Sequence, residues 1–299
     1  MKRFARMAPA ALAGAGLLAG TMLAAGAALS AAAPVALRTT ELGQGPTLVF
    51  VHELGAGRLA WMPLARMLIG RYHVVLVDLP GHGESPMPDP FTLETAAAAL
   101  DQVMARQKPD STVLVGHGVG GVIALLEASG HPERMRGVVV IAAAARSPNP
   151  IPDQQREIYL RQIDEHYADF VRVMFMAQGR DSAQGVAVHA QAALVPPATM
   201  KSYLRELLIL DATGAVKRLK VPLLFLGAEK TWPAGQGWPE MAKRYGYDEA
   251  RDVSWRRIGA SGHYVAQDQP DSVATALVDF TARVLAPAAS SGKQAPAKP

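Results

Sequence analysis

Four short segments of this 299-residue chain place histidine or acidic side chains among glycines, each directly after a run of apolar residues. The segments are His52-Glu53, Asp78 to Ser85, Gly116 to Gly121 and Gly262-His263. Histidine moves protons near neutral pH, and glycine permits a close approach of the backbone to another group. These residue types indicate acid–base or acyl-transfer chemistry, provided that the fold brings the four segments together.

The apolar runs before these segments are rich in Val, Ile and Leu, and helical patterns separate them. The runs cover Thr47–Val51, His73–Val77, Thr112–Val115, Gly137–Ala142 and Val221–Gly227, and a further strand is predicted around Val253 to Ile258. Continuous rather than alternating apolar runs indicate strands buried on both faces, and the helices between them imply parallel strands with right-handed crossovers. The sequence therefore predicts an open, mostly parallel α/β sheet flanked by helices.

The pattern changes between the fourth and the fifth run. Residues 146–219 contain no strand run, and helical stretches are predicted at Gln154–Ala177 and Pro197–Leu210. We interpret this insertion as a helical cap, which leaves residues 34–145 and 220–285 as the core. Residues 286–299 are rich in Pro, Ala, Ser and Lys, a composition typical of a disordered tail.

The N-terminal segment has the composition of a targeting signal. A basic start at Lys2, Arg3 and Arg6 precedes an uncharged stretch from Met7 to Leu37. A basic region, an apolar region and small residues are typical of a secretory signal, so residues 1–33 predict an exported protein, periplasmic or secreted. The alternative is an uncleaved membrane anchor, because the apolar stretch is long enough to span a bilayer.

Composition excludes several classes of function. The chain has no cysteine, which excludes a thiolate nucleophile and cysteine-ligated metals. Removal of Lys2, Arg3 and Arg6 lowers the formal charge from +4 to +1, and no Lys/Arg cluster remains that favours nucleic acid. A small molecule is the expected partner, with membrane contact only through the N-terminal segment.

In their order and positions, the four segments resemble those of the α/β-hydrolase superfamily, in the lineage of capped esterases and peptidases. The resemblance covers roughly residues 40 to 285. It implies a serine nucleophile at the turn after the third run, a histidine before the last helix, and an acid after the strand that follows the cap. His263 matches the histidine position.

The other two positions depart from the family pattern. The nucleophile position holds Gly118, which has no side chain for attack. The acid position holds Lys230, a cation that cannot stabilise an imidazolium. Glu229 is one residue away and is a possible shifted acid. Replacing Gly118 by Ser together with Lys230 by Asp is expected to raise esterase activity if the pocket is intact.

The residues expected to form the oxyanion hole also differ from the family. Val119 follows the nucleophile position, and the loop with Glu53 and Leu54 is expected to supply a second N–H. The family commonly has Gly where this chain has Glu53. This Glu either points outward from its loop or partners His263 in an altered site.

The sequence predicts no metal and no cofactor. No H-E-x-x-H or comparable ligand spacing occurs. Gly116, Gly118 and Gly121 spell a dinucleotide-type pattern, but the turn follows the third run and the next strand carries no acidic residue for a ribose.

Two functions follow from these residues, and whether the chain is an enzyme stays open between them. The first is a degenerate hydrolase that binds a small apolar ligand without serine-type hydrolysis. The second is an active hydrolase or lyase in which His263 acts as general base, with water or substrate, on ester-like or carbonyl compounds. An ordinary serine hydrolase has the least support, because no serine sits in a G-x-S-x-G turn.

Overall fold

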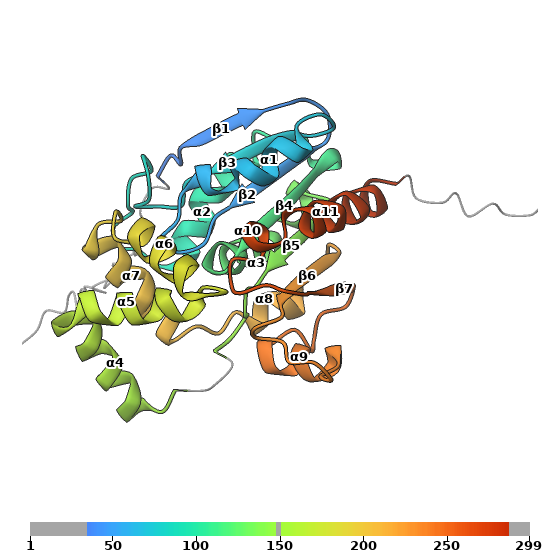
Figure 1. Cartoon of the computed structure of the whole chain (residues 1–299). Coiled ribbons are helices and arrows are strands. Elements are labelled where there is room, and N and C mark those ends of the chain that lie inside the picture. Colours follow the sequence, from blue (N-terminus) through green and yellow to red (C-terminus); the bar gives the residue numbers. More distant parts are fainter. Residues whose placement is uncertain (1–34, 148–150, 287–299) are drawn as a thin grey trace, which may run out of the picture. The chain divides into compact units, whose positions relative to one another are not determined.

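The computed structural model describes residues 35–147 and 151–286, and a seven-stranded sheet lies at the centre of this part of the chain (Figure 1). The spatial order is β1-β3-β2-β4-β5-β6-β7. Only β1 is antiparallel to its neighbour, β3. The strands are β1 (Thr39–Leu42), β2 (Thr47–Val51), β3 (His73–Val77), β4 (Thr112–His117), β5 (Gly137–Ile141), β6 (Leu223–Ala228) and β7 (Val253–Ile258).

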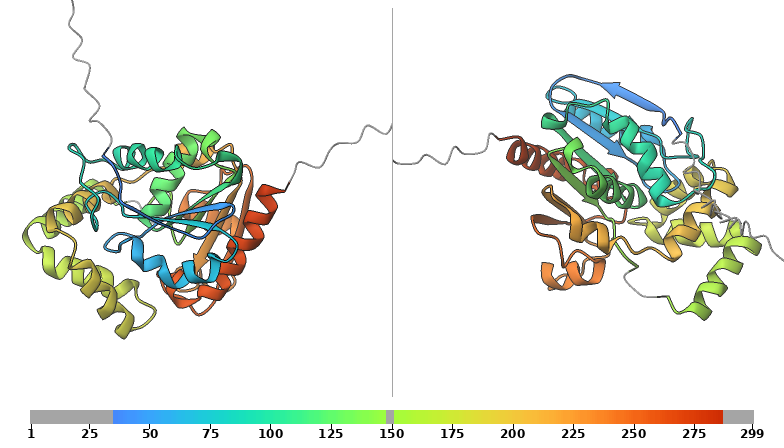
Figure 2. Two further views of the ribbon diagram at one scale, coloured as in Figure 1. Left: turned by 90° about the horizontal axis from the view of Figure 1, so that it is seen from above. Right: turned by 180° about the vertical axis from the view of Figure 1, so that it is seen from behind.

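Helices cover both faces of the sheet (Figure 2). On one face α1 (Met62–Leu68) contacts α11 (Pro270–Leu285), and on the other α3 (Val119–Gly130) contacts α2 (Leu93–Met104) and α8 (Thr213–Arg218). Strand β2 supplies both layers, because Leu48 and Phe50 belong to one apolar core and Val49 and Val51 to the other. Burial on both faces explains the continuous apolar runs. The predicted α/β-hydrolase fold is confirmed.

Four helices follow β5 and gather on one side of the sheet (Figure 1). They are α4 (Asp153–Glu165), α5 (Tyr167–Gln178), α6 (Ser182–Ala192) and α7 (Pro197–Leu208). The chain then returns through α8 to β6, so the insertion precedes the last two strands as predicted. The shorter elements are η1 (Arg58–Trp61), η2 (Pro109–Ser111), η3 (Pro132–Arg134), α9 (Trp238–Tyr245) and α10 (Val265–Asp268).

Some local predictions were incomplete. Strand β1 was missed, since its sequence is polar and half exposed. Helix α6 was missed as well. The helical segment between β2 and β3 is divided into the short η1 and α1, because Pro63 favours the first turn of a new helix.

Both predicted terminal segments concern residues that the structure leaves undescribed. The targeting segment at 1–33 is one, and the tail beyond Ala286 is the other. Within the ranges that the structure does describe, no helix is both long and apolar enough to cross a membrane.

Two glycines of α3 allow a matched test of the close packing behind the site. A Cβ at Gly120 would lie 2.3 Å from the carbonyl oxygen of His52, whereas a Cβ at Gly130 would meet no atom within 4 Å. We expect Gly120→Ala to destabilise the fold by about 1–3 kcal/mol through overpacking. Gly130→Ala should be neutral or stabilising by up to about 1 kcal/mol. Urea unfolding measures both, and equal stability of the two variants would contradict the close contact.

Candidate functional site

The turn between β4 and α3 forms the centre of the site. Gly118 has a φ of 50°, a backbone conformation that favours glycine. Its N–H donates to the carbonyl oxygen of Ile141 at 3.0 Å, which fixes the turn against β5. The N-terminus of α3 follows directly, so the N–H of Val119 is free of helix bonding and points out of the turn.

The side chain of Glu53 occupies the space above this turn. A Cβ built on Gly118 would lie 1.1 Å from Glu53 Oε2. The same oxygen accepts a hydrogen bond from Val119 N–H at 3.0 Å. A carboxylate from another loop therefore stands where the nucleophile's side chain would be, and it takes one of the N–H groups expected to stabilise an oxyanion.

Glu53 also contacts the predicted histidine. Its Oε2 lies 3.3 Å from His263 Nε2, an ion-pair distance without the alignment of a hydrogen bond. Burial raises the pKa of Glu53, but contact with His263, the nearby His117 and the backbone N–H of Leu54 lower it by more, so the net pKa falls below its usual value. Glu53 is 6% exposed. Of the two readings of Glu53, the contacts support partnership with His263.

Backbone and ring contacts hold His263 in place. Its N–H donates to the carbonyl oxygen of Gln178, at the end of cap helix α5, at 3.0 Å. The ring of His117 packs on the His263 ring with centroids 4.9 Å apart, and His117 Nε2 lies 2.8 Å from the carbonyl oxygen of His263. His117 is therefore a site residue to which the sequence analysis gave no role, although it directly precedes the turn.

Neither candidate for the acid position contacts His263. The Nζ of Lys230 donates to the carbonyl oxygens of Ala177 and Gly179, at 2.8 Å and 2.5 Å. The carboxylate of Glu229 accepts from Arg257 at 2.7 Å and from Ala260 N–H at 2.5 Å. The bond from Ala260 and the Arg257 guanidinium lower the pKa of Glu229. Lys230 thus attaches the core to the cap, and Glu229 orders the loop that leads to His263.

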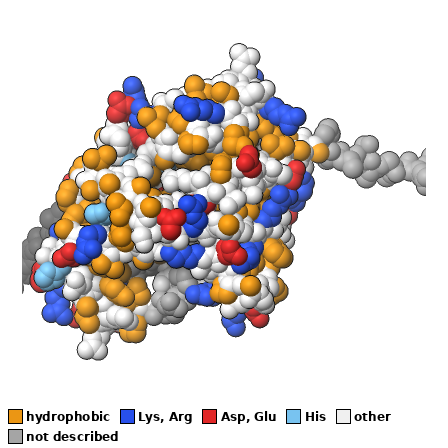
Figure 3. Space-filling model, viewed as in Figure 1, with side chains coloured by type: hydrophobic (Ala, Val, Ile, Leu, Met, Phe, Trp, Pro, Cys, Tyr) orange, Lys and Arg blue, Asp and Glu red, His pale blue; other side chains and the backbone are white. Residues whose placement is uncertain are grey.

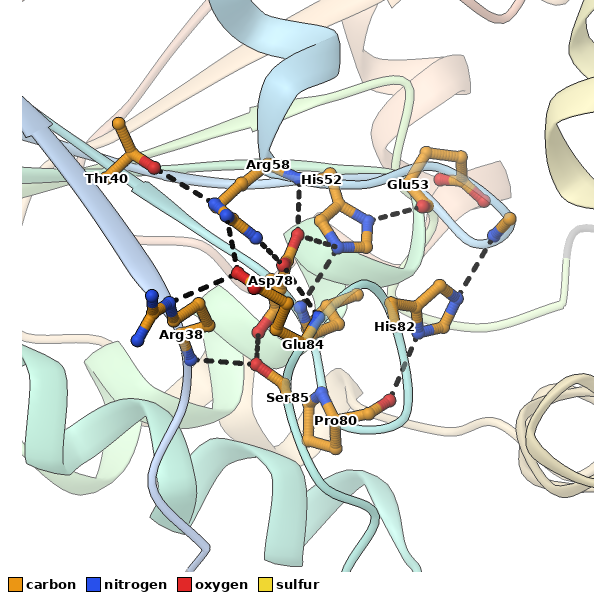
Figure 4. Close-up of polar contacts among 12 residues, drawn as sticks. Arg38, Thr40, His52, Glu53, Arg58, Asp78, Pro80, His82, Glu84 and Ser85 are labelled. Carbon is orange, nitrogen blue, oxygen red and sulfur yellow. Dashed lines mark hydrogen bonds and ion pairs between the residues drawn. The ribbon is translucent and has the colours of Figure 1, made fainter. Parts of the chain in front are cut away.

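A buried polar network holds the loop that carries Glu53 (Figure 4). His52 Nδ1 donates to the carbonyl oxygen of Glu53 at 2.7 Å, and His52 Nε2 accepts from Leu79 N–H at 2.9 Å. His82 Nε2 accepts from Gly55 N–H at 3.3 Å. Asp78 accepts from the backbone N–H and the guanidinium of Arg58. These residues position Glu53 and are themselves structural.

Three side chains at the site have the donor types of a metal centre. Glu53, His117 and His263 each offer an atom, and these atoms lie within 4.8 Å of one another. One carboxylate and two imidazoles are also the ligand set of some catalytic zinc sites. The absence of a metal therefore remains a prediction.

Open space adjoins the pair of Glu53 and His263. A cleft of about 260 Å³ is lined by both residues, by Gly118 and by cap residues Leu207 and Leu210. A more enclosed pocket of about 180 Å³ is also lined by His263, and its walls are mainly apolar or aromatic. Both volumes lie below the roughly 300–1,000 Å³ of pockets for drug-sized ligands, so each would suit only a smaller molecule. On the face shown in Figure 3, acidic and basic side chains are interspersed rather than gathered into a single-sign surface.

The fold and this site define an α/β-hydrolase-type protein in which the Glu53 carboxylate lies against Gly118 and Val119 at the turn between β4 and α3. The model of the "Alpha/beta hydrolase family" matches residues 48–276. The chain belongs to this family.

Curated relatives with esterase names share the sequence pattern. The chain is 29% identical over 246 residues to a "Biotin biosynthesis bifunctional protein BioHC" of Cellvibrio japonicus, covering 79% of this chain and 47% of that protein. It is 31% identical over 196 residues to a "Pimeloyl-[acyl-carrier protein] methyl ester esterase" of Vibrio cholerae, covering 62% and 75%. The matched region spans less than half the length of the bifunctional protein and of several of the esterases.

Solved structures of hydrolases share the fold. A hydrolase from Oleispira antarctica superposes with a TM-score of 0.71 at 16% identity, covering 81% of this chain and 93% of that one. A thermophilic esterase from Thermogutta terrifontis gives a TM-score of 0.69 at 21% identity, covering 84% and 94%. At these identities the similarity concerns the fold alone.

The clash at Gly118 changes what is needed to rebuild a serine site. We expect Gly118→Ser with Lys230→Asp to give no labelling by a fluorophosphonate probe, because Glu53 fills the space of the new side chain. Adding Glu53→Gly should permit labelling. Gel fluorescence and mass spectrometry measure the adduct, and heat-denatured protein is the control. Equal labelling of the double and triple variants would mean that Glu53 leaves the turn freely.

Buried neutral histidines near the site predict a loss of stability in acid. Burial first, then the neighbouring His263, lowers the pKa of His117 from 6.5 to about 4. Between these values the unfolded chain binds a proton and the native chain does not, so stability falls as the pH drops from 6.5 towards 4. The change is on the order of 3 kcal/mol.

His117→Asn should reduce this pH dependence, whereas His166→Asn, at an exposed cap position, should leave it unchanged. Urea unfolding across this pH range measures the slope. An unchanged slope in His117→Asn would contradict the assignment of His117 as a buried neutral group.

Proposed function

We propose that this protein hydrolyses small carboxylic esters with water, in place of serine, as the nucleophile. In this proposal His263 is the general base, and Glu53 stabilises the imidazolium that forms. The observation that carries the proposal is the position of the Glu53 carboxylate, above Gly118 and 3.3 Å from His263 Nε2. Relatives named as methyl ester esterases support the choice of an ester.

The proposed reaction balances without a cofactor. A water oxygen attacks the ester carbonyl carbon while one water proton passes to His263. The tetrahedral intermediate then breaks its bond to the alcohol oxygen, and the departing alkoxide takes the proton from His263. The products are a carboxylic acid and an alcohol, and both side chains return to their starting state.

The electrostatics of the pair suit this role. Glu53 has a lowered pKa, so it is ionised at neutral pH and faces the nitrogen that gains charge. The acid of a triad stabilises the imidazolium through the other ring nitrogen, Nδ1, whereas Glu53 lies next to Nε2 itself. Nε2 makes no hydrogen bond to any described residue, so its lone pair remains available for a proton.

The same arrangement limits the expected rate. Val119 N–H already donates to Glu53 Oε2, so it stabilises an oxyanion only after that bond is broken. Oxyanion-hole donors are worth roughly 10²–10³ in kcat. Slow turnover compared with serine hydrolases of the family is therefore part of the proposal.

A second candidate is a protein that binds a small apolar ligand without turnover. One observation favours it: the groups expected to act in serine-type hydrolysis are already engaged. The N–H groups of Val119 and Leu54 bond to Glu53, and Lys230 bonds to the carbonyl oxygen of Ala177. The same cleft and pocket would then serve for binding alone.

Hydrolysis of short p-nitrophenyl esters distinguishes the two candidates. We expect slow turnover by the wild type, no fluorophosphonate labelling, and a loss of kcat of at least about 10²-fold in His263→Ala, the usual contribution of general base catalysis. Glu53→Gln should lower kcat by about tenfold or more. Glu157→Gln, on the exposed side of α4, is the matched control and should retain activity.

Other outcomes have equally definite meanings. Activity that survives in His263→Ala contradicts the proposal. Absence of turnover with measurable binding of apolar esters supports the second candidate. Loss of activity on chelation, restored by Zn²⁺ and dependent on His117, would replace the metal-free mechanism by one at Glu53, His117 and His263.

A further inference from the structure

A buried acid with no hydrogen-bond partner among the described residues lies near the end of α3 that is remote from the candidate site. Glu127 is near the end of α3 and is 1% exposed. Neither of its carboxylate oxygens makes a hydrogen bond to any described residue. Burying an unsatisfied polar group is costly, and nearly all such groups in native proteins have a partner. A ligand from outside the described residues would supply the partner that Glu127 lacks.

Two further donors converge on Glu127. Asp101 lies on α2, and His131 directly follows α3. Each of the three residues offers one ligand atom, and these atoms lie within 4.8 Å of one another. The elements that carry them pack together, since α2 contacts α3. Asp101 and Glu127 therefore come from a packed helix pair, and His131, whose Nδ1 also lies 3.4 Å from Glu133 Oε1, comes from the turn after α3.

The charges around Glu127 favour a cation. Asp101 lies beside Glu127. The Arg134 guanidinium makes no hydrogen bond to Glu127, and its Nε donates to Asp101 Oδ1 at 2.9 Å. That bond engages one oxygen of Asp101 and orients its carboxylate, as outer partners of metal ligands do. A divalent ion would neutralise the two carboxylates more completely than Arg134 alone.

We propose that Asp101, Glu127 and His131 bind a first-row divalent transition ion of the Zn²⁺ class between α2 and α3. An imidazole donor favours such an ion, whereas Mg²⁺ and Ca²⁺ prefer oxygen donors alone. The site is structural. Glu127 lies eight residues after Val119 on the same helix, about 12 Å along its axis, so the ion would be remote from Glu53 and His263.

The ion would secure the helix that begins at the site. Helix α3 carries Val119 at its first position and Glu127 in its last turns. A bridge from Glu127 and His131 to Asp101 joins this end to α2. The expected effect is a higher free energy of unfolding, because an ion that binds only the native state stabilises that state.

Thermal unfolding and titration calorimetry with ZnCl₂, after removal of metals by a chelator, test this site. We expect Zn²⁺ to raise the Tm of the wild type and to bind with an affinity that falls at least about tenfold in Glu127→Gln. This variant should fold, since glutamine has the shape of the protonated acid. His131→Asn is a second variant and should show the same loss.

Two controls separate this site from others. Glu94→Gln changes an exposed acid on α2 and should keep the full effect of Zn²⁺. Glu53→Gln removes a donor from the candidate active site and should also keep it. MgCl₂ and CaCl₂ should raise the Tm much less than ZnCl₂.

Three results would overturn the inference. One is a wild type whose Tm does not respond to Zn²⁺. Another is a Glu127→Gln protein that keeps the full response. The third is a response lost only in Glu53→Gln, which would place the ion at the active site. None of these outcomes depends on whether the protein hydrolyses esters.

Discussion

The site depends on the steric exclusion between residue 118 and the carboxylate of Glu53. Only a glycine leaves room for Glu53 Oε2, because a Cβ at this position would lie 1.1 Å from that oxygen. The N–H of Val119, which directly follows the turn, stabilises the carboxylate by donating to Glu53 Oε2 at 3.0 Å. Gly118 is therefore part of an alternative arrangement, in which the negative charge next to His263 comes from the loop after β2.

The surrounding network explains how a buried carboxylate holds this position. His52 bonds to the carbonyl oxygen of Glu53 and His82 to the N–H of Gly55, and burial lowers the pKa of both rings, which favours their neutral forms. Neutral rings can accept from Leu79 and Gly55 N–H, which imidazolium could not. The resulting loop is rigid, so Glu53 is directed at the turn instead of pointing into solvent.

The sequence predicts those parts of the structure that are encoded locally. Continuous apolar runs identify the five strands β2 to β6, whereas β7 is polar and partly exposed, and glycine spacing identifies the turn at Gly118. Strand β1 has no such pattern, since an edge strand with half-exposed residues needs no apolar face. Helix α6 begins at a recognisable cap, where Asp181 accepts from Gln184 N–H, so this signal was present and was overlooked.

The partnership of Glu53 with His263 is not encoded locally, because 210 positions separate the two residues. Their loops meet only when the ends of β2 and β7 lie at the same edge of the folded sheet. Glu229 illustrates the same limit: it neighbours the expected acid position, yet Arg257 and Ala260 N–H turn its carboxylate to the loop.

With Glu53 present, the cation at position 230 is also understandable. A carboxylate there would place a second negative charge close to a histidine that already has one partner. Lys230 instead extends to carbonyl oxygens at the end of α5, and His263 N–H donates to Gln178 in the same segment. The loop after β6 and the loop that carries His263 are thus bonded to the same end of α5. Gly118, Glu53 and Lys230 fit one arrangement, in which the negative charge beside His263 comes from the loop after β2 and the loop after β6 serves to attach the cap helix.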